Sequence, residues 1–514
     1  MSKKLLPQNS EWTLESLQLY EKAILDIAQA FDLDTYNNQI EIISAEQMLD
    51  LYASSGLPIN YTHWSFGKRF VNTEKLYRKG YTNLAYEMVI NSDPCISYLL
   101  EENTMVLQAM VMAHACYGHN SFFKNNYLFK TWTNADSIID YMVFAKNYIH
   151  ECEEKYGSTA VEELLDACHA LRNYGIDRYK RPQKISLQEE KTRQSERAAY
   201  LQSQVNDLWI TIPPHFQKNS LTDKKEHFPK EPEENLLYFL EKNAPLLEPW
   251  QREIIRISRK IAQYFYPQKL TKVMNEGWAT FWHYRIINEL YNQKMVSDSF
   301  MMEFFKNHTN LIYQLPYDSP GFYGINPYTL GYHLFSDIER ICRDPTKEDE
   351  VFFPDLTNTP PLEALDFAMR NFKDESFILQ YLSPKLIRDL KLFSVLDDSN
   401  EPDLKITAIH DEVGYTALRE GLSQQYNLDS VEPRIQIYEA HIKSDRAIIL
   451  RHTQINHRPL DETSTQEVLK HFHALWGFDV ILESVSPQGT VLKIVRCPST
   501  APTVRSNVSA QHTR

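Results

Sequence analysis

The spacing of apolar residues changes near residue 398, and this change limits the folds open to the chain. Before it, apolar residues recur at helical spacing, for example in Leu14–Phe31 and Ala135–Tyr156. After it, short β-branched segments such as RIQIYEAH and AIILRHTQI are interspersed with helical stretches. We therefore predict a mainly α protein, in which a large helical domain precedes a small C-terminal α+β domain.

The same pattern predicts the domain boundaries. The helical domain is expected over residues 10–395, with a charged and proline-rich excursion at 178–235, and the α+β domain over 399–496. Residues 497–514 carry little apolar material, so we expect a disordered tail. Within the helical domain, Ile96–Gly118 is expected to be an apolar helix that an Asp-Pro pair starts, either continuous or broken near Glu101–Asn103.

Composition excludes several classes of function. A net charge of −14 argues against sequence-independent nucleic-acid binding. No apolar run is long enough for a membrane span, and the first residues do not resemble a secretory signal. Six scattered cysteines without a C-x-x-C pair indicate reduced thiols and a cytoplasmic location. The P-loop, G-x-G-x-x-G and G-x-S-x-G motifs are absent, so nucleotide binding and serine hydrolysis have no motif support.

The string AHACYGHN contains the first candidate site residues, His114 and His119. On a straight α-helix, positions five apart lie about 140° apart, so the two rings would face different ways. Gly118 changes this expectation, because a glycine can end the helix or adopt a left-handed conformation and bring His119 beside His114. A two-histidine metal site and a pair of core and capping histidines both remain open.

The string NEGWATFWH contributes Glu276 and His283, which stand seven positions apart on one helical face. The rise between them is about 10.5 Å, which is too long for both to bind one ion easily. One of them is then a ligand and the other an outer partner or proton carrier. The alternative is that the aromatic residues around them simply pack a core. A carboxylate with imidazoles is the ligand set favoured by Zn, Mn or Fe.

Weaker candidates lie elsewhere in the chain. His63 is expected at the surface, with a loop-ligand or anion-contact role as the alternative, and Cys116 is expected to be a core thiol. Lys124, Asn125 and Asn126 stand between aromatic residues, where they suit substrate binding or the fixing of a loop.

Several long strings of this sequence resemble the SpoVR family, the stage V sporulation protein R-like proteins. The similarity covers about residues 10–495 and includes AHACYGHNSFFKNNYLFK, MNEGWATFWHYRI, LGYHLFSDIERICRDPT and LWGFDVILE. The resemblance implies a role in spore cortex formation or, in bacteria that form no spores, in stress or stationary-phase physiology near a serine kinase system. It also places His114, His119, Glu276 and His283 in the family's His- and Glu-bearing strings, but it gives no substrate.

Two function hypotheses follow. In the first, the chain is a metal-dependent hydrolase in which His114, His119 and Glu276 hold a divalent transition metal. Glu276 and His283 would be the catalytic residues, and the loop at 315–331 would cover the site. In the second, the chain is a regulatory or scaffold protein whose His and Glu residues form a structural network. Its C-terminal domain would then bind a partner protein.

Overall fold

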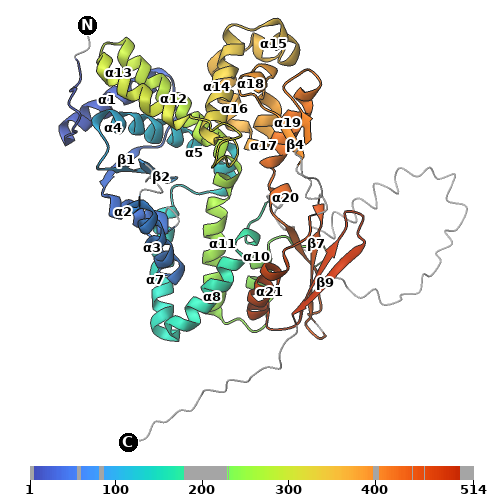
Figure 1. Ribbon diagram of the computed structural model, residues 1–514. Helices are drawn as coiled ribbons and strands as arrows, with labels where there is room; N and C mark the ends of the chain where they lie inside the picture. Colours follow the sequence, from blue (N-terminus) through green and yellow to red (C-terminus); the bar gives the residue numbers. More distant parts are fainter. Residues whose placement is uncertain are drawn as a thin grey trace, which may run out of the picture.

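The computed structural model describes residues 5–54, 59–79, 86–178, 228–229, 231–396, 405–442, 444–455 and 458–497. Figure 1 shows helices through most of the molecule and a sheet near the C-terminal end of the chain. The predicted fold class, a large helical part followed by a small α+β part, is confirmed. The predicted tail and most of the charged excursion at 178–235 lie outside the described residues.

The N-terminal part combines helices with a three-stranded sheet. Helix α1 (Leu14–Ala30) begins at Thr13, whose side chain and that of Ser16 cap each other's backbone. The sheet has the order β1-β3-β2, with β1 parallel and β2 antiparallel to the central strand β3. Its strands and the helices that precede and follow them are β1 (Asn38–Ile43), α2 (Ala45–Ala53), α3 (Trp64–Arg78), β2 (Glu87–Ile90), β3 (Cys95–Leu100) and α4 (Met105–Met112).

The helix predicted over Ile96–Gly118 was wrong in its first third. Residues Cys95–Leu100 form β3, and helix α4 starts only after Thr104, whose side chain accepts from the Leu107 backbone N–H. Five of the six β3 residues are buried, and the sequence CISYLL is uncharged and mostly apolar, as in a buried helix. Periodicity cannot separate the two structures here; the neighbours β1 and β2 decide for the strand.

The remaining elements are mostly helices. Between α4 and the long helices lie η1 (Ala113–His119), α5 (Asn120–Asn125), α6 (Tyr127–Trp132), α7 (Ile138–Tyr156), α8 (Ser158–Ala170), η2 (Arg172–Tyr174) and α10 (Leu236–Asn243). The middle of the chain forms α11 (Pro249–Leu270), α12 (Lys272–Asn292), α13 (Asp298–Leu311), α14 (Pro327–Arg343), α15 (Lys347–Phe352), η4 (Leu356–Asn358), α16 (Pro361–Asn371), α17 (Asp374–Tyr381) and α18 (Pro384–Asp389). The last part holds β4 (Ser394–Leu396), β5 (Lys405–Ala408), α19 (Gly414–Gln425), α20 (Leu428–Val431), β6 (Arg434–Ala440), β7 (Ile448–Thr453), α21 (Glu462–Trp476), β8 (Val480–Val485) and β9 (Val491–Cys497).

Two large apolar clusters form the core. The first gathers α1, α4, η1, α12, α14 and α17, and it includes Leu418 and Leu422 of α19. The second joins α7, α8, α10 and α11 to the C-terminal sheet and α21. That sheet has the order β6-β7-β8-β9, with β7 and β8 parallel across the α21 connection. Because α19 packs in the first cluster and the sheet in the second, the domain boundary at 395–399 stays a prediction.

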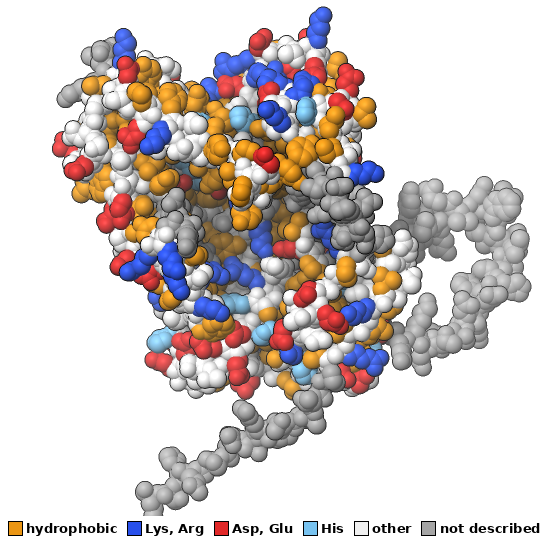
Figure 2. Space-filling model, in the orientation of Figure 1, with side chains coloured by type: hydrophobic (Ala, Val, Ile, Leu, Met, Phe, Trp, Pro, Cys, Tyr) orange, Lys and Arg blue, Asp and Glu red, His pale blue; other side chains and the backbone are white. Residues whose placement is uncertain are grey.

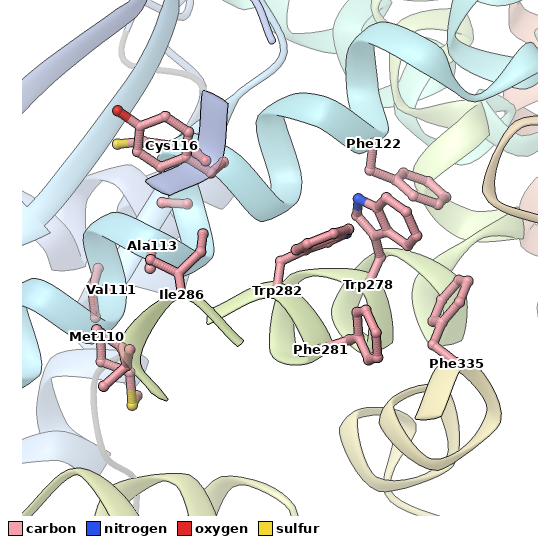
Figure 3. Packing of buried hydrophobic residues seen from close by; sticks show 14 of the residues in the cluster. Met110, Val111, Ala113, Cys116, Phe122, Trp278, Phe281, Trp282, Ile286 and Phe335 are labelled. Atoms are coloured by element: carbon pink, nitrogen blue, oxygen red, sulfur yellow. The ribbon is translucent and has the colours of Figure 1, made fainter. Parts of the chain in front are cut away.

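Aromatic side chains of α12 fill the centre of the first cluster. Trp278 lies between Phe122 of α5 and Phe335 of α14, and Phe281 and Trp282 lie beside it (Figure 3). The Trp278 and Phe335 ring centroids are 5.1 Å apart in an edge-on contact. At about 100° per residue these aromatic side chains lie on the side of α12 opposite Glu276 and His283, so the helix packs into the core with the face that carries the candidate site turned the other way. None of the described helices is long and apolar enough to cross a membrane.

Candidate metal centre

His114 and His119 come together because the segment that contains them is a π-helix. Residues Ala113–His119 form η1, whose backbone hydrogen bonds run between residues five positions apart. Side chains at that spacing meet on one side, and the two ring centroids are 4.6 Å apart. Sequence reasoning assumed α-helical geometry and needed Gly118 to end the helix or turn left-handed. That expectation was wrong, because Gly118 lies inside η1 and has no positive φ.

Gly118 has a different role, which is to let α12 approach η1 closely. A Cβ atom at this position would lie 2.5 Å from the Ala279 Cα atom. The same helix meets α14 at two facing glycines, since a Cβ on Gly277 would lie 2.3 Å from the Gly331 Cα atom. These close approaches bring the carboxylate of Glu276, next to Gly277 on α12, against the two histidines.

Four side chains converge on one small space. The Glu276 Oε2 atom lies 3.5 Å from His119 Nε2 and 3.7 Å from His114 Nε2. The Oε1 atom of Glu87, on β2, lies 3.8 Å from His114 Nε2. Glu87, His114 and His119 each offer a ligand atom within 4.8 Å of the others, and Glu276 is closer still to both histidines. The group thus holds two imidazoles and two carboxylates.

The distances fit the edges of a coordination polyhedron. Bonds of about 2.1 Å to a tetrahedral zinc ion place neighbouring ligand atoms about 3.4 Å apart. Within the described part of the chain, His114 Nε2 and Glu276 Oε2 are buried and have no hydrogen-bond partner. Buried polar atoms without partners are costly, and a shared ion satisfies both at once.

The outer nitrogen of His119 defines which atom faces the site. Its Nδ1 lies 2.9 Å from the Oδ1 atom of Asn275, and a carbonyl oxygen can only accept, so Nδ1 carries the proton. A neutral ring then presents a lone pair at Nε2, directly opposite the Glu276 carboxylate. Two acceptors facing each other in a buried space repel unless a cation lies between them.

The protonation of the group agrees with this picture. Burial lowers the pKa of His119 to about 4, so the ring is neutral at pH 7. Burial acts to raise the pKa of Glu276, but His114, His119 and the Tyr328 phenol hold it below its ordinary value. For Glu87 burial dominates and the pKa is raised, although His114 opposes the rise. Of the two carboxyl groups, Glu276 therefore ionises more readily than Glu87.

A chain of imidazoles extends outward from His114. Its Nδ1 lies 2.9 Å from His283 Nδ1, and His283 Nε2 lies 2.9 Å from His308 Nδ1 on α13. Burial lowers the pKa of His283 well below its ordinary value and that of His308 to about 4. If His114 Nε2 binds a metal, its Nδ1–H donates to His283, whose Nε2–H donates to His308. One bound ion would thus fix the tautomers of all three rings.

The structure brings the side chains of His114, His119 and Glu276 together, and it places His283 outside them, behind His114. The roles of these residues as metal ligands and catalytic groups stay predictions. Sequence reasoning did not find four residues of the arrangement. Asn275 could have been found, because it adjoins Glu276 in the sequence. The other three come from separate elements with no shared motif: Glu87 on β2, His308 on α13 and Tyr328 on α14.

The weaker candidates have structural positions. Lys124 Nζ lies 2.8 Å from the Thr35 carbonyl oxygen, and Asn126 donates to the carbonyl oxygens of Met369 and Phe372, so these side chains fix loops. Cys116 is a buried thiol whose pKa burial raises to about 12, as expected of a core cysteine.

Two other expectations have mixed outcomes. The surface position expected for His63 was wrong, since only 5% of the residue is exposed. The loop predicted over 315–331 was wrong at its end, since residues 327–331 belong to α14. Tyr328 in this helix lies against the site, with its ring centroid 6.2 Å from that of His114 in a stacked contact.

Comparison with known proteins assigns the chain to a family. The SpoVR like protein family matches residues 11–431, and the SpoVR-like C-terminal domain matches residues 433–487. A relative from Escherichia coli (strain K12), named "Uncharacterized protein YcgB", is 59% identical over 493 residues, which cover 96% of each chain. No solved structure matches. The chain therefore belongs to the SpoVR-like protein family.

Proposed function

We propose that this chain is a metal-dependent hydrolase. His114 Nε2, His119 Nε2 and Glu276 Oε2 are the proposed ligands of one divalent transition metal, with Zn, Mn and Fe as the candidates. The observation that carries the proposal is the pair of facing acceptors, His119 Nε2 and Glu276 Oε2, at 3.5 Å in a buried space. A histidine and a carboxylate in a structural network would instead share a proton at hydrogen-bond distance.

The remaining groups suit water activation. A metal bound by three protein ligands supplies an acidic water or hydroxide at its open position. Glu87 lies on the far side of His114 from the imidazole chain, where its Oε1 atom can accept a proton from that water. His283 holds His114 in one orientation and is the proposed carrier of a proton toward His308. Tyr328 shields the Glu276 side of the group.

The cellular setting of the proposal follows the family. Six free cysteines, four of them buried, fit a cytoplasmic protein, and a role in spore cortex formation or stress physiology is inferred from the resemblance. The alternative function, a scaffold with a structural His and Glu cluster, predicts that the protein binds no metal. It is favoured by the imidazole chain, which satisfies several ring nitrogens without any ion.

Metal analysis of the purified full-length chain separates the two. We expect a stoichiometric transition metal by plasma mass spectrometry, lost in His119→Ala and in Glu276→Gln. Glu289→Gln is the matched control, because Glu289 lies on the same helix and its carboxylate accepts hydrogen bonds, among the described residues, from Asn292 and Gln293 alone. Hydrolysis of activated ester, amide and phosphoester substrates should fall at least about 100-fold in the two metal-free variants.

The opposite result is equally clear. Wild-type protein that stays metal-free after incubation with Zn, Mn and Fe(II), and variants that differ from it only in stability, would establish the scaffold function. Circular dichroism of each variant shows whether it is folded, so a loss of metal is not confused with a loss of structure.

A further inference from the structure

A cavity of about 450 Å³ lies where helices α2 and α3 pack beside the first sheet. Its volume is in the range of small-molecule binding sites, and it is open toward solvent. Apolar, aromatic and acidic side chains line it, among them Ile43, Glu46, Asp50, Leu51, Phe70 and Tyr98. The described residues that line the cavity include no Lys, Arg or His.

The cavity lies on the opposite side of strand β3 from the candidate metal centre. Tyr98 packs in the small apolar cluster that contains Met48 and Leu51 of α2, whereas the next residue, Leu99, belongs to the first core cluster. Successive side chains of a strand point to opposite faces of the sheet. Glu87 is the register partner of Leu99, so it lies on the core side with the histidines. The cavity is therefore a separate site.

The two carboxylates of the cavity are placed unfavourably for helix α2 itself. Glu46 and Asp50 stand four positions apart, a spacing at which like charges on a helix repel each other. Glu46 lies in the first turn, where the helix dipole favours an acid, but Asp50 lies in the last turn, where the dipole disfavours one. Among the described residues, no ion pair or hydrogen bond to either carboxylate offsets this cost. A bound cation would offset it.

The aromatic and apolar lining also suits an organic cation. Phe70 and Tyr98 are half-buried, and the face of an aromatic ring attracts an ammonium group. Ile43 and Leu51 are buried and offer an apolar surface to a carbon chain. A further carboxylate, that of the exposed Glu41, is beside Tyr98 in the pairing of β1 with β3. In the space-filling view, Lys and Arg side chains gather over α3 and in the hollow between α3 and the C-terminal sheet, outside the lining of this cavity (Figure 2).

We propose that this cavity binds an aliphatic polyamine, with a four-carbon diamine as the smallest ligand that reaches both carboxylates. Glu46 and Asp50 are about one helical turn apart, with a rise of about 6 Å between them. An extended four-carbon chain separates its two ammonium groups by a similar distance. Each ammonium group pairs with one carboxylate, and the carbon chain lies against Leu51 and the rings of Phe70 and Tyr98. The proposal does not depend on the hydrolase function.

Calorimetric titration of the full-length chain with butane-1,4-diamine tests the proposal. Sodium chloride at about 0.15 M screens the general attraction of a diamine to a chain whose net charge is −14. We expect saturable binding that weakens about three- to fivefold in Asp50→Asn and in Glu46→Gln. Asp26→Asn is the matched control, because Asp26 is exposed on α1 and its carboxylate has no partner among the described residues. This variant loses the same charge and should bind as the wild type does.

Two further arms test the parts of the site. Phe70→Leu removes an aromatic ring but keeps an apolar side chain, so the affinity should fall about two- to fivefold. Butylamine carries one ammonium group and should bind the wild type at least about threefold more weakly than the diamine does. Circular dichroism shows whether each variant is folded, and the two carboxylate variants alter exposed side chains.

Several results would overturn the proposal. The first is an absence of saturable diamine binding by the wild type. The second is equal affinity in the wild type, Asp50→Asn and Glu46→Gln, or an equal loss in Asp26→Asn, which would indicate general attraction to an acidic chain. Unchanged affinity in Phe70→Leu, or butylamine binding as tight as that of the diamine, would exclude the arrangement of two carboxylates and an aromatic wall.

Discussion

Replacement of Gly118 by alanine tests the close packing on which the metal centre depends. The new methyl carbon would lie 2.5 Å from the Cα atom and 2.7 Å from the Cβ atom of Ala279. Carbon atoms in contact prefer a separation of about 3.5–4.0 Å, so α12 must move by about 1 Å to make room. Overpacking of this kind costs about 1–3 kcal/mol in the free energy of unfolding.

The same movement should weaken metal binding. The Glu276 carboxylate is carried on α12, and its distances of 3.5 and 3.7 Å to the two histidines define the proposed coordination. Ligand distances in metal sites tolerate changes of only about 0.2 Å, so a shift of about 1 Å should lower the affinity at least tenfold. Urea denaturation followed by tryptophan fluorescence reports stability, and a competition titration with a zinc chelator reports affinity.

Gly67→Ala is the control for Gly118→Ala. Gly67 lies in helix α3, and a Cβ there would meet nothing within 4 Å. The same change should therefore stabilise the protein by about 0.5–1 kcal/mol through helix propensity alone. Opposite signs of the two effects are expected. If both variants shift the urea midpoint alike, or if Gly118→Ala binds zinc as tightly as the wild type, the packing argument fails.

Two further predictions concern single side chains. Asn275→Leu removes the acceptor of the His119 Nδ1–H, so zinc affinity should fall about 10–100-fold in the chelator competition; unchanged affinity would show that Asn275 does not set the tautomer. Burial raises the pKa of Asp349, but hydrogen bonds from Arg340 and Thr346 outweigh it and lower the pKa to about 2 from 3.8. The carboxylate thus contributes about 2 kcal/mol above pH 4 that is lost as the pH falls toward 2, and urea titrations at these pH values should show less acid sensitivity in Asp349→Asn.

Much of the helical architecture could be predicted from apolar spacing. The pattern of α1 and the β-branched segments of β6, β7 and β8 gave correct elements, because each buries one face or both faces against a neighbour. The segment Cys95–Leu100 was predicted wrongly, since its uncharged and mostly apolar sequence fits a buried helix and a central strand equally well. Only pairing with two other strands distinguishes these structures.

In the candidate site, too, residues within a local motif could be found from the sequence, whereas residues brought in by tertiary packing could not. The residue types and spacing in AHACYGHN and NEGWATFWH were enough to select His114, His119 and Glu276. Glu87 could not be found, because it lies on a strand that reaches the histidines only through the packing of β2 and β3 against η1. His308 likewise meets His283 across two helices that carry no common motif.

Two requirements explain why residues Ala113–His119 form a π-helix: the flanking residues must stay buried, and both histidines must face Glu276. Met110 before it and Phe122 after it are both buried in the same apolar cluster, at 4% and 0% exposure, while His114 and His119 must face Glu276 (Figure 3). A straight α-helix would turn His119 about 140° away from His114. Bonds between residues five apart keep both rings on the inner side and let the flanking helices α4 and α5 remain packed. Because a π-helix is rarer and less favourable than an α-helix, the surrounding core must stabilise it, and such segments recur at functional sites. The segment thus adopts a less favourable helix type, and this helix places two imidazoles and a carboxylate around one point.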